Sequence, residues 1–136
     1  PAGQRNSIME IITENATSLA WIGDAIMTLK VREHILKKGY RKADILQKKS
    51  ARICSAKGQA CILSTLREEN FFNEVECEIL QRGRNATIHS KAKNADGKTY
   101  LEATALEALI GYLYLYEHQD RLEQLLDKVI EYGDKL

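Results

Sequence analysis

Proline is nearly missing from this sequence, because its only proline is Pro1. A proline inside a helix removes a backbone hydrogen bond and clashes with the preceding turn. The rest of the chain therefore lacks the strongest helix breaker. It also lacks internal repeats and the alternating apolar and polar runs that are typical of strands. These absences predict an all-α fold.

Long hydrophobic runs and paired cysteines are absent as well. No run approaches the roughly 18 apolar residues of a membrane-spanning helix, and the start of the chain has no apolar stretch of a signal peptide. Cys54, Cys61 and Cys77 are an odd set without C-x-x-C spacing, which argues against a disulfide framework or a zinc site. We therefore expect small buried thiols in a reducing cytoplasm.

Charge is nearly balanced overall but unevenly distributed. Residues 30–57 hold ten Lys or Arg side chains against two acids, and residues 82–98 hold five against one. Residues 99–136 hold three basic side chains against eight acidic ones. The two basic segments favour a surface that binds a polyanion. A merely solvated helix surface is the alternative at this point.

Apolar side chains recur at three- and four-residue spacings through most of the chain, which predicts several amphipathic helices. The predicted helices cover residues 7–14, 18–38, 43–67 with a break near 53–55, 74–84, 100–117 and 120–132. Ser18 is the predicted N-cap of the second of these. Residues 85–99 are predicted to form a long basic loop with a turn at 94–97. We expect an N-terminal segment over 1–15 and one domain over 16–136.

Two acids lie among apolar neighbours, Asp24 in "LAWIGDAIM" and Glu107 in "ALEALIGYLYL". Gly23 precedes the first acid and Gly111 follows the second by one turn, so two helices can cross there with their carboxylates facing. Burial and mutual repulsion would raise both pKa values, and a divalent cation removes both problems. Mg²⁺ is often held by one or two carboxylates plus water and phosphate. A metal beside a basic face predicts phosphodiester hydrolysis. The alternative is two acids that cap helix ends or pair with arginine.

The segment "QRGRNATIHSKAKN", residues 81–94, is a second candidate site. Arg82 and Arg84 flank Gly83 near a predicted helix end, and guanidinium forks suit phosphate oxygens. Asn85 can reach a sugar hydroxyl, and RNA duplexes are recognised largely through phosphates and 2′-hydroxyls. An ordinary exposed loop would have a similar sequence. The three histidines show no metal-ligand or catalytic spacing and are interpreted as surface groups.

These motifs resemble the ribonuclease III catalytic-domain family. "LAWIGDAIM" is similar to its signature E-x-L-E-F-L-G-D-A, and "EALIGYLYL" is similar to its second acidic motif, D-x-x-E-A-L-I-G. "KKSARICSAKGQA" at 48–60 and "RGRNA" at 82–86 resemble the short bacterial branch, Mini-ribonuclease III. The resemblance covers about 16–134. It implies a helical, homodimeric catalytic domain.

The chain departs from the larger family in its carboxylates. That family has four at each cleavage site, and the resemblance matches Asp24 and Glu107 to two of them. Ala20 and Thr104 stand where two others are expected, each one helical turn from a retained acid. Glu102 lies roughly 140° around the helix from Glu107 and is a poor substitute. We therefore expect weaker metal binding, with water and RNA phosphate completing the coordination.

The resemblance implies a Mg²⁺-dependent endoribonuclease that cleaves double-stranded RNA, with Mn²⁺ as a substitute metal. It also implies a role in maturing the 23S ribosomal RNA precursor, and cytoplasmic localisation. Asp24 and Glu107 are the expected catalytic and metal-binding residues, and Trp21 is expected at the dimer interface, unless it is a core residue. Without a separate double-stranded-RNA-binding domain, the catalytic domain must hold the RNA itself. The expected RNA-binding residues are Lys57, Arg82, Arg84, Asn85, Lys91 and Lys93.

Two other classes of protein remain as alternatives. A non-catalytic RNA-binding ribosome-assembly factor on the same fold would explain the missing carboxylates. A helical protein-interaction module would have no role with RNA. Metal-dependent cleavage separates the enzyme from the assembly factor, and salt-dependent binding of an RNA duplex separates both from the interaction module.

Overall fold

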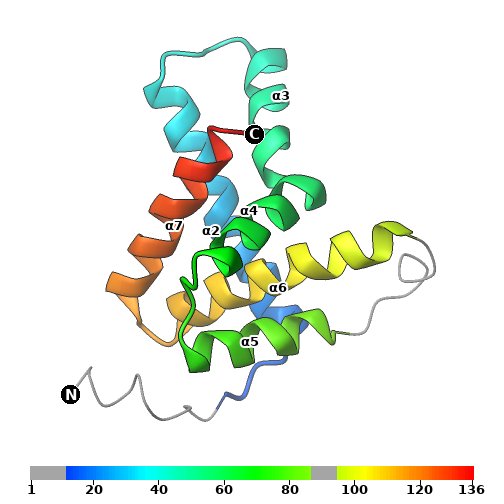
Figure 1. The fold of residues 1–136 in the computed structure, drawn as a ribbon. Helices are drawn as coiled ribbons and strands as arrows, with labels where there is room; N and C mark the ends of the chain where they lie inside the picture. Colours follow the sequence, from blue (N-terminus) through cyan, green and yellow to red (C-terminus); the bar gives the residue numbers. More distant parts are fainter. Residues whose placement is uncertain (1–11, 87–94) are drawn as a thin grey trace.

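The computed structural model describes residues 12–86 and 95–136, which contain six helices and no strand (Figure 1). The helices are α2 (Ala16–Lys37), α3 (Ala43–Cys54), α4 (Ala56–Glu68), α5 (Glu74–Arg84), α6 (Ala95–Leu115) and α7 (Gln119–Gly133). The predicted all-α class is therefore confirmed for the described part of the chain. None of its helices is long and apolar enough to cross a membrane.

Helix α6 lies at the centre of the fold and contacts α2, α4, α5 and α7 (Figure 1). From Ala103 to Leu113 its residues are all buried except Glu107, which is half-buried. A helix that is apolar on every face must be covered on every side, and four neighbouring helices provide that cover. Glu107 is thus the one carboxylate in the most buried stretch of the described chain.

Most predicted helices are observed, and their ends show what the sequence pattern misses. The break in the predicted 43–67 helix is confirmed at Ser55, which ends α3 and caps α4 by accepting a hydrogen bond from the Gly58 N–H at 3.1 Å. The Ser18 cap is wrong. Asn15 is the N-cap of α2, and its side chain accepts the Ser18 N–H at 2.8 Å. Both residue types are good caps, so composition alone does not separate them.

The start of α6 differs most from the prediction. Residues 95–99 are helical, so the turn predicted at 94–97 is wrong over 95–97, while Asn94 lies outside the described residues. Packing outweighs the turn-forming sequence here, because Gly97 is buried and Glu102, further along α6, pairs with Arg84 of α5. Of the helix predicted over 7–14, residues 12–14 are not helical and 7–11 lie outside the described residues.

The cysteines are free, but two of them are not buried as expected. Cys61 and Cys77 are exposed, and only Cys54 is partly buried. Cys61 lies on the outward side of α4, because the apolar stripe of that helix passes through Ile62, Leu63 and Leu66. Cys54 ends α3 and Cys61 lies on α4, so the two thiols have different surroundings.

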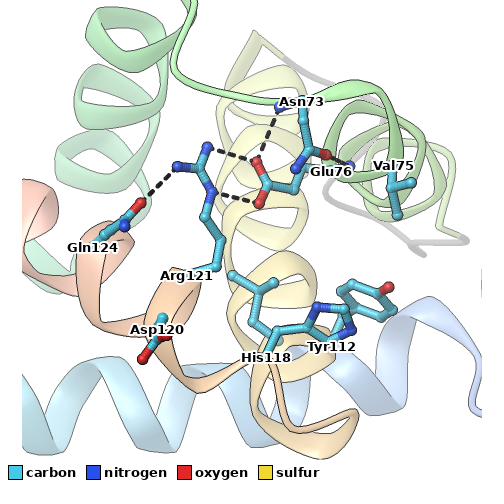
Figure 2. A pocket seen from close by; sticks show the side chains of 9 residues that line it. Asn73, Val75, Glu76, Tyr112, His118, Asp120, Arg121 and Gln124 are labelled. Carbon is cyan, nitrogen blue, oxygen red and sulfur yellow. Dashed lines mark hydrogen bonds and ion pairs between the residues drawn. The ribbon is translucent and has the colours of Figure 1, made fainter. Parts of the chain in front are cut away.

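An ion pair between a buried acid and a partly exposed arginine ties α5 to α7. Arg121 donates from Nε to Oε2 of Glu76 at 2.6 Å and from Nη2 to Oε1 at 2.9 Å, and it also donates to the Phe71 carbonyl. Glu76 additionally accepts the Asn73 N–H in a capping box at the start of α5. Figure 2 shows the guanidinium facing this carboxylate. Both side chains line a cavity of about 390 Å³. Because Glu76 is only 2% exposed, the pair is a structural anchor of the fold.

Candidate metal centre

The predicted crossing of two glycine-bearing helices is present in the structure. A Cβ atom on Gly23 of α2 would lie 1.8 Å from the carbonyl oxygen of Glu107 on α6, and one on Gly111 would lie 1.9 Å from that of Leu19. Such distances allow no side chain larger than hydrogen at either position. The two glycines therefore let the helix backbones touch where Asp24 and Glu107 project.

The two acids face each other across this crossing. Burial raises the pKa of Glu107 to about 7, and the negative charge of the nearby Asp24 adds to this rise. The expectation that both acids are buried is wrong for Asp24, which is exposed on α2. Thr28, one turn further along, donates its hydroxyl to Oδ1 of Asp24 at 3.4 Å. The centre is thus an exposed acid set against a half-buried one.

Gln59 of α4 is a third polar group at this centre, and sequence reasoning missed it. Its Nε2 donates to Oε2 of Glu107 at 3.1 Å and to the carbonyl of Cys54 at 2.9 Å. A signal was present in the sequence. Gln59 precedes Ile62 and Leu63 at the three- and four-residue spacing of an apolar stripe, and this spacing predicts that its amide is buried.

Ala20 and Thr104, where the resemblance led us to expect two further carboxylates, supply no second acid. Ala20 and Thr104 are both buried, and the Thr104 hydroxyl donates to the Tyr100 carbonyl at 3.0 Å. Glu102 points elsewhere, because its carboxylate accepts from both Arg67 and Arg84. Among the described residues no group of three or more His, Cys, Asp or Glu side chains is placed to hold a metal ion.

This donor set fits Mg²⁺ and does not fit a metal that needs a closed protein cage. Two facing carboxylates, Asp24 and Glu107, with a pKa raised in one of them, gain from a hard cation that neutralises their repulsion. Mg²⁺ keeps several waters and commonly uses one or two protein carboxylates. A structural zinc site would need four closely spaced ligands, which the described part of the chain does not bring together.

The predicted RNA-binding residues have different surroundings. Lys57 is exposed in the first turn of α4, two residues before Gln59. Arg82 is exposed and lies 3.6 Å from Glu78, whereas Arg84 is only partly exposed and pairs with Glu102. Further residues of this predicted set lie at or beyond the end of α5. Asn85 is its exposed C-cap, and Lys91 and Lys93 lie outside the described residues.

Trp21 is not a core residue, because 80% of its surface is exposed. It lies on the same side of α2 as Ala25 and Leu29, at four-residue spacing, and Leu29 is 63% exposed. Two large apolar side chains exposed together on one side of a helix often mark a surface that contacts another molecule. The alternative of a core tryptophan is thus excluded for the single chain.

Comparisons with known proteins agree with this geometry. Residues 17–118 match the Ribonuclease III domain family. Mini-ribonuclease 3 of Staphylococcus aureus is 46% identical over 116 residues, covering 85% of this chain and 87% of the relative. Mini-ribonuclease 3 of Streptococcus pneumoniae is 41% identical, covering 86% and 91%.

A solved structure shows the same arrangement of helices. The crystal structure of a protein from Fusobacterium nucleatum superposes with a TM-score of 0.77 at 31% sequence identity, covering 91% of this chain and 98% of that one. The matched domain and these relatives span most of the chain, including both acid-bearing helices. The chain therefore belongs to the Mini-ribonuclease 3 family, whose members are endoribonucleases of the ribonuclease III type.

Proposed function

We propose that this protein is a Mg²⁺-dependent endoribonuclease that cleaves double-stranded RNA, with residues 16–136 as its catalytic domain. The observation that carries the proposal is the glycine-lined helix crossing, which sets Glu107 close enough to Asp24 for the charge of Asp24 to raise its pKa. A half-buried acid beside another acid is a costly arrangement unless a cation joins them. The two acids are the proposed metal-binding and catalytic residues.

The chain contributes binding and orientation to the reaction. Mg²⁺, when bound, activates a water and neutralises charge that develops on the phosphate. Asp24 reaches solvent and can meet the RNA phosphate, while Glu107 is held from the core side by Gln59. Together they orient the attacking water toward phosphorus as the bond to the leaving sugar oxygen breaks. Mn²⁺ carries the same charge and accepts oxygen ligands, so it is the proposed substitute.

The proposed RNA grip uses exposed basic side chains. Lys57 lies on the helix that carries Gln59, and Arg82 and Asn85 lie on the exposed end of α5. Arg84 forms an ion pair with Glu102, and this pair holds the end of α5 against α6. Its proposed role is therefore partly to position its neighbours on α5 for RNA. Lys91 and Lys93 complete the proposed set. Few contacts of this kind give modest, strongly salt-dependent affinity.

We also propose that the active form is a homodimer in which Trp21 lies at the interface. The support is the exposed apolar side of α2 that Trp21 shares with Leu29. Two copies related by a two-fold axis would present two cleavage centres, which matches the two strands of a duplex. The proposed substrate in the cell is the 23S ribosomal RNA precursor in the cytoplasm.

A labelled RNA duplex of generic sequence tests this function. We expect cleavage only when Mg²⁺ is present and none by Asp24→Asn, which keeps the exposed side chain's shape but removes its charge. Binding of the duplex should persist in the variant and weaken with salt. Equal cleavage by the variant would refute the assignment of Asp24. Binding without cleavage in both proteins would favour the assembly-factor function, which the absence of acids at Ala20 and Thr104 supports.

A further inference from the structure

Gln59 has a burial that packing alone does not explain. It is 2% exposed and occupies a position on the apolar stripe of α4, where leucine or methionine would fill the same space. Its Oε1 is buried and has no hydrogen-bond partner among the described residues. An unpaired buried oxygen of this kind destabilises the folded state. Such a group calls for an explanation in function.

The neighbours of the amide fix its orientation. Glu107 Oε2 and the Cys54 carbonyl are both acceptors, so only the NH₂ end of Gln59 can face them. Both N–H groups are therefore used, one on the acid and one on the backbone where α3 ends. The opposite orientation would set an oxygen against two oxygens. Because the NH₂ group of Gln59 faces Glu107 and Cys54, its Oε1 points away from them and has no partner among the described residues.

The two hydrogen bonds connect the acid to a rigid part of the backbone. Cys54 is the last residue of α3, and Ser55 begins the capped first turn of α4 that carries Gln59. Gly58 packs against the carbonyls of Arg52 and Ile53 so closely that a Cβ would lie within 2.3 Å of the first. The α3–α4 junction therefore cannot shift easily, and neither can the amide that it holds.

We propose that Gln59 is a positioning residue for the metal centre, in which its amide holds the Glu107 carboxylate in one orientation beside Asp24. Hydrogen-bond partners behind metal ligands fix the geometry of those ligands, and their loss commonly weakens metal affinity by about 10- to 100-fold. With two of the usual four acids replaced, each remaining acid supplies a larger share of the binding. The inference rests on the proposed function, because it assumes that Glu107 holds the metal.

The test compares Gln59→Met with Asn73→Ala. Methionine keeps the length and fills the apolar stripe but donates no hydrogen bond. Asn73→Ala removes the N-cap of a different helix, α5, and should lower the melting temperature without altering the hydrogen bonds of Gln59. Mn²⁺ binding is measured by calorimetry in the absence of RNA, and duplex cleavage and melting temperature are measured in parallel.

We expect the dissociation constant for Mn²⁺ to rise about 10- to 100-fold in Gln59→Met and to stay unchanged in Asn73→Ala. Unaltered affinity in Gln59→Met, or an equal loss in both variants, would overturn the positioning role. If the unaltered protein neither binds Mn²⁺ nor cleaves RNA, the proposed function itself fails. If the unaltered protein binds Mn²⁺ and cleaves RNA, and Gln59→Met does both equally well, only the positioning role of Gln59 is refuted.

A second measurement uses the unaltered protein and so does not depend on the variant's folding. Addition of Mg²⁺ should shift the side-chain ¹⁵N–¹H resonances of Gln59, because the acid that accepts its hydrogen bond changes charge environment. The exposed Gln47 on α3 is the matched reference and should not respond. Gln59 resonances that stay in place while Mg²⁺ binds would contradict the proposal.

Discussion

At the scale of single residues, Glu107 and Asp24 face each other from very different surroundings. Glu107 is half-buried in the central helix, whereas Asp24 is exposed on α2. Burial, followed by the Asp24 charge, raises the pKa of Glu107 to about 7, from an ordinary value of 4.5. The structure therefore holds a proton on Glu107 at pH values where the unfolded chain has released it.

This difference predicts a pH-dependent stability in metal-free buffer. Below about pH 4.5 the group is protonated in both states, and above about 7 it is ionised in both. Between these values unfolding releases a proton, so the free energy of unfolding falls as pH rises, by at most about 1.4 kcal/mol per unit. We expect Glu107→Gln to lack this fall and to become relatively more stable from pH 5 to pH 8. Urea unfolding of both proteins with a chelator present measures it. A constant difference across that range would contradict the account.

Only part of this acid pair and its surroundings could be predicted from the sequence. The pairing of Asp24 with Glu107 could be predicted, because Gly23 and Gly111 each mark a close backbone approach. The exposure of Asp24 could not, since an apolar run does not reveal which side of the helix is covered. Gln59 was missed because an amide on an apolar stripe has no motif, and its partner lies 48 residues away.

At the scale of elements, the α2–α6 crossing depends on the absence of side chains. Gly23→Ala would place a Cβ 1.8 Å from the Glu107 carbonyl oxygen, so the helices must separate. We expect a loss of about 3 kcal/mol in the free energy of unfolding and loss of duplex cleavage, because the acids move apart. Chemical denaturation and the cleavage assay check both.

Gly39→Ala is the matched control for that change. Gly39 has a φ of 101°, and a Cβ atom there would have no neighbour within 4 Å, so alanine meets backbone strain without a clash. The expected loss is about 1–2 kcal/mol with cleavage retained under folding conditions. Equal effects of the two substitutions on cleavage would show that the crossing does not position the acids.

The ion pair between Arg121 and Glu76 should contribute strongly to the stability of the fold. Arg121→Met leaves Glu76 buried without its cation, and we expect a loss of about 3–5 kcal/mol in the free energy of unfolding. Lys135→Met removes an exposed cation 3.9 Å from Glu131 and should change the free energy of unfolding by less than about 1 kcal/mol. Thermal and urea unfolding of the two variants should therefore differ clearly, and similar melting temperatures would contradict the anchoring role of Arg121.

Helix positions were more predictable than helix ends. The helix at 74–84 was predicted at its observed bounds, because a strong N-cap and a clear apolar stripe agree there. The start of α6 was not, because Asp96 and Gly97 favour a turn locally while packing on α5 favours a helix. Local sequence preference was outweighed by contacts with residues distant in sequence, which a sequence pattern does not contain.

At the scale of the whole molecule, the exposed side of α2 is the feature that a single chain leaves unexplained. Trp21→Ser removes the most exposed large apolar side chain of the described residues, which is 80% accessible. We expect the variant to sediment as a monomer, or to dimerise at least about 10-fold more weakly, because a central tryptophan often dominates an interface. Its melting temperature at low concentration should be unchanged. A monomeric unaltered protein would contradict the dimer proposal, and an equally stable variant dimer would contradict the role of Trp21.

The distribution of charge over the molecule fits this picture of an RNA-cleaving surface. The first basic segment spans the end of α2, all of α3 and the start of α4, which leads to Gln59 and the centre. Some of its cations are engaged in the fold, since Arg41 donates to the carbonyls of Leu36 and Tyr40 and Lys38 pairs with Asp134. The exposed remainder is available to phosphate, so a chain of almost balanced charge has the surface that the proposed RNA binding needs.

A double-mutant cycle on Asp24 and Glu107 shows whether the two acids work as one metal centre. Cleavage of one RNA duplex is followed with saturating Mg²⁺ for the unaltered protein, Asp24→Asn, Glu107→Gln and the double variant. If the two acids hold one metal centre, each single substitution should reduce the rate by about 100-fold or more, equivalent to about 3 kcal/mol, and the double variant should be hardly slower than either. Losses that multiply independently, or a single variant that cleaves at the full rate, would contradict the claim that these two carboxylates act together.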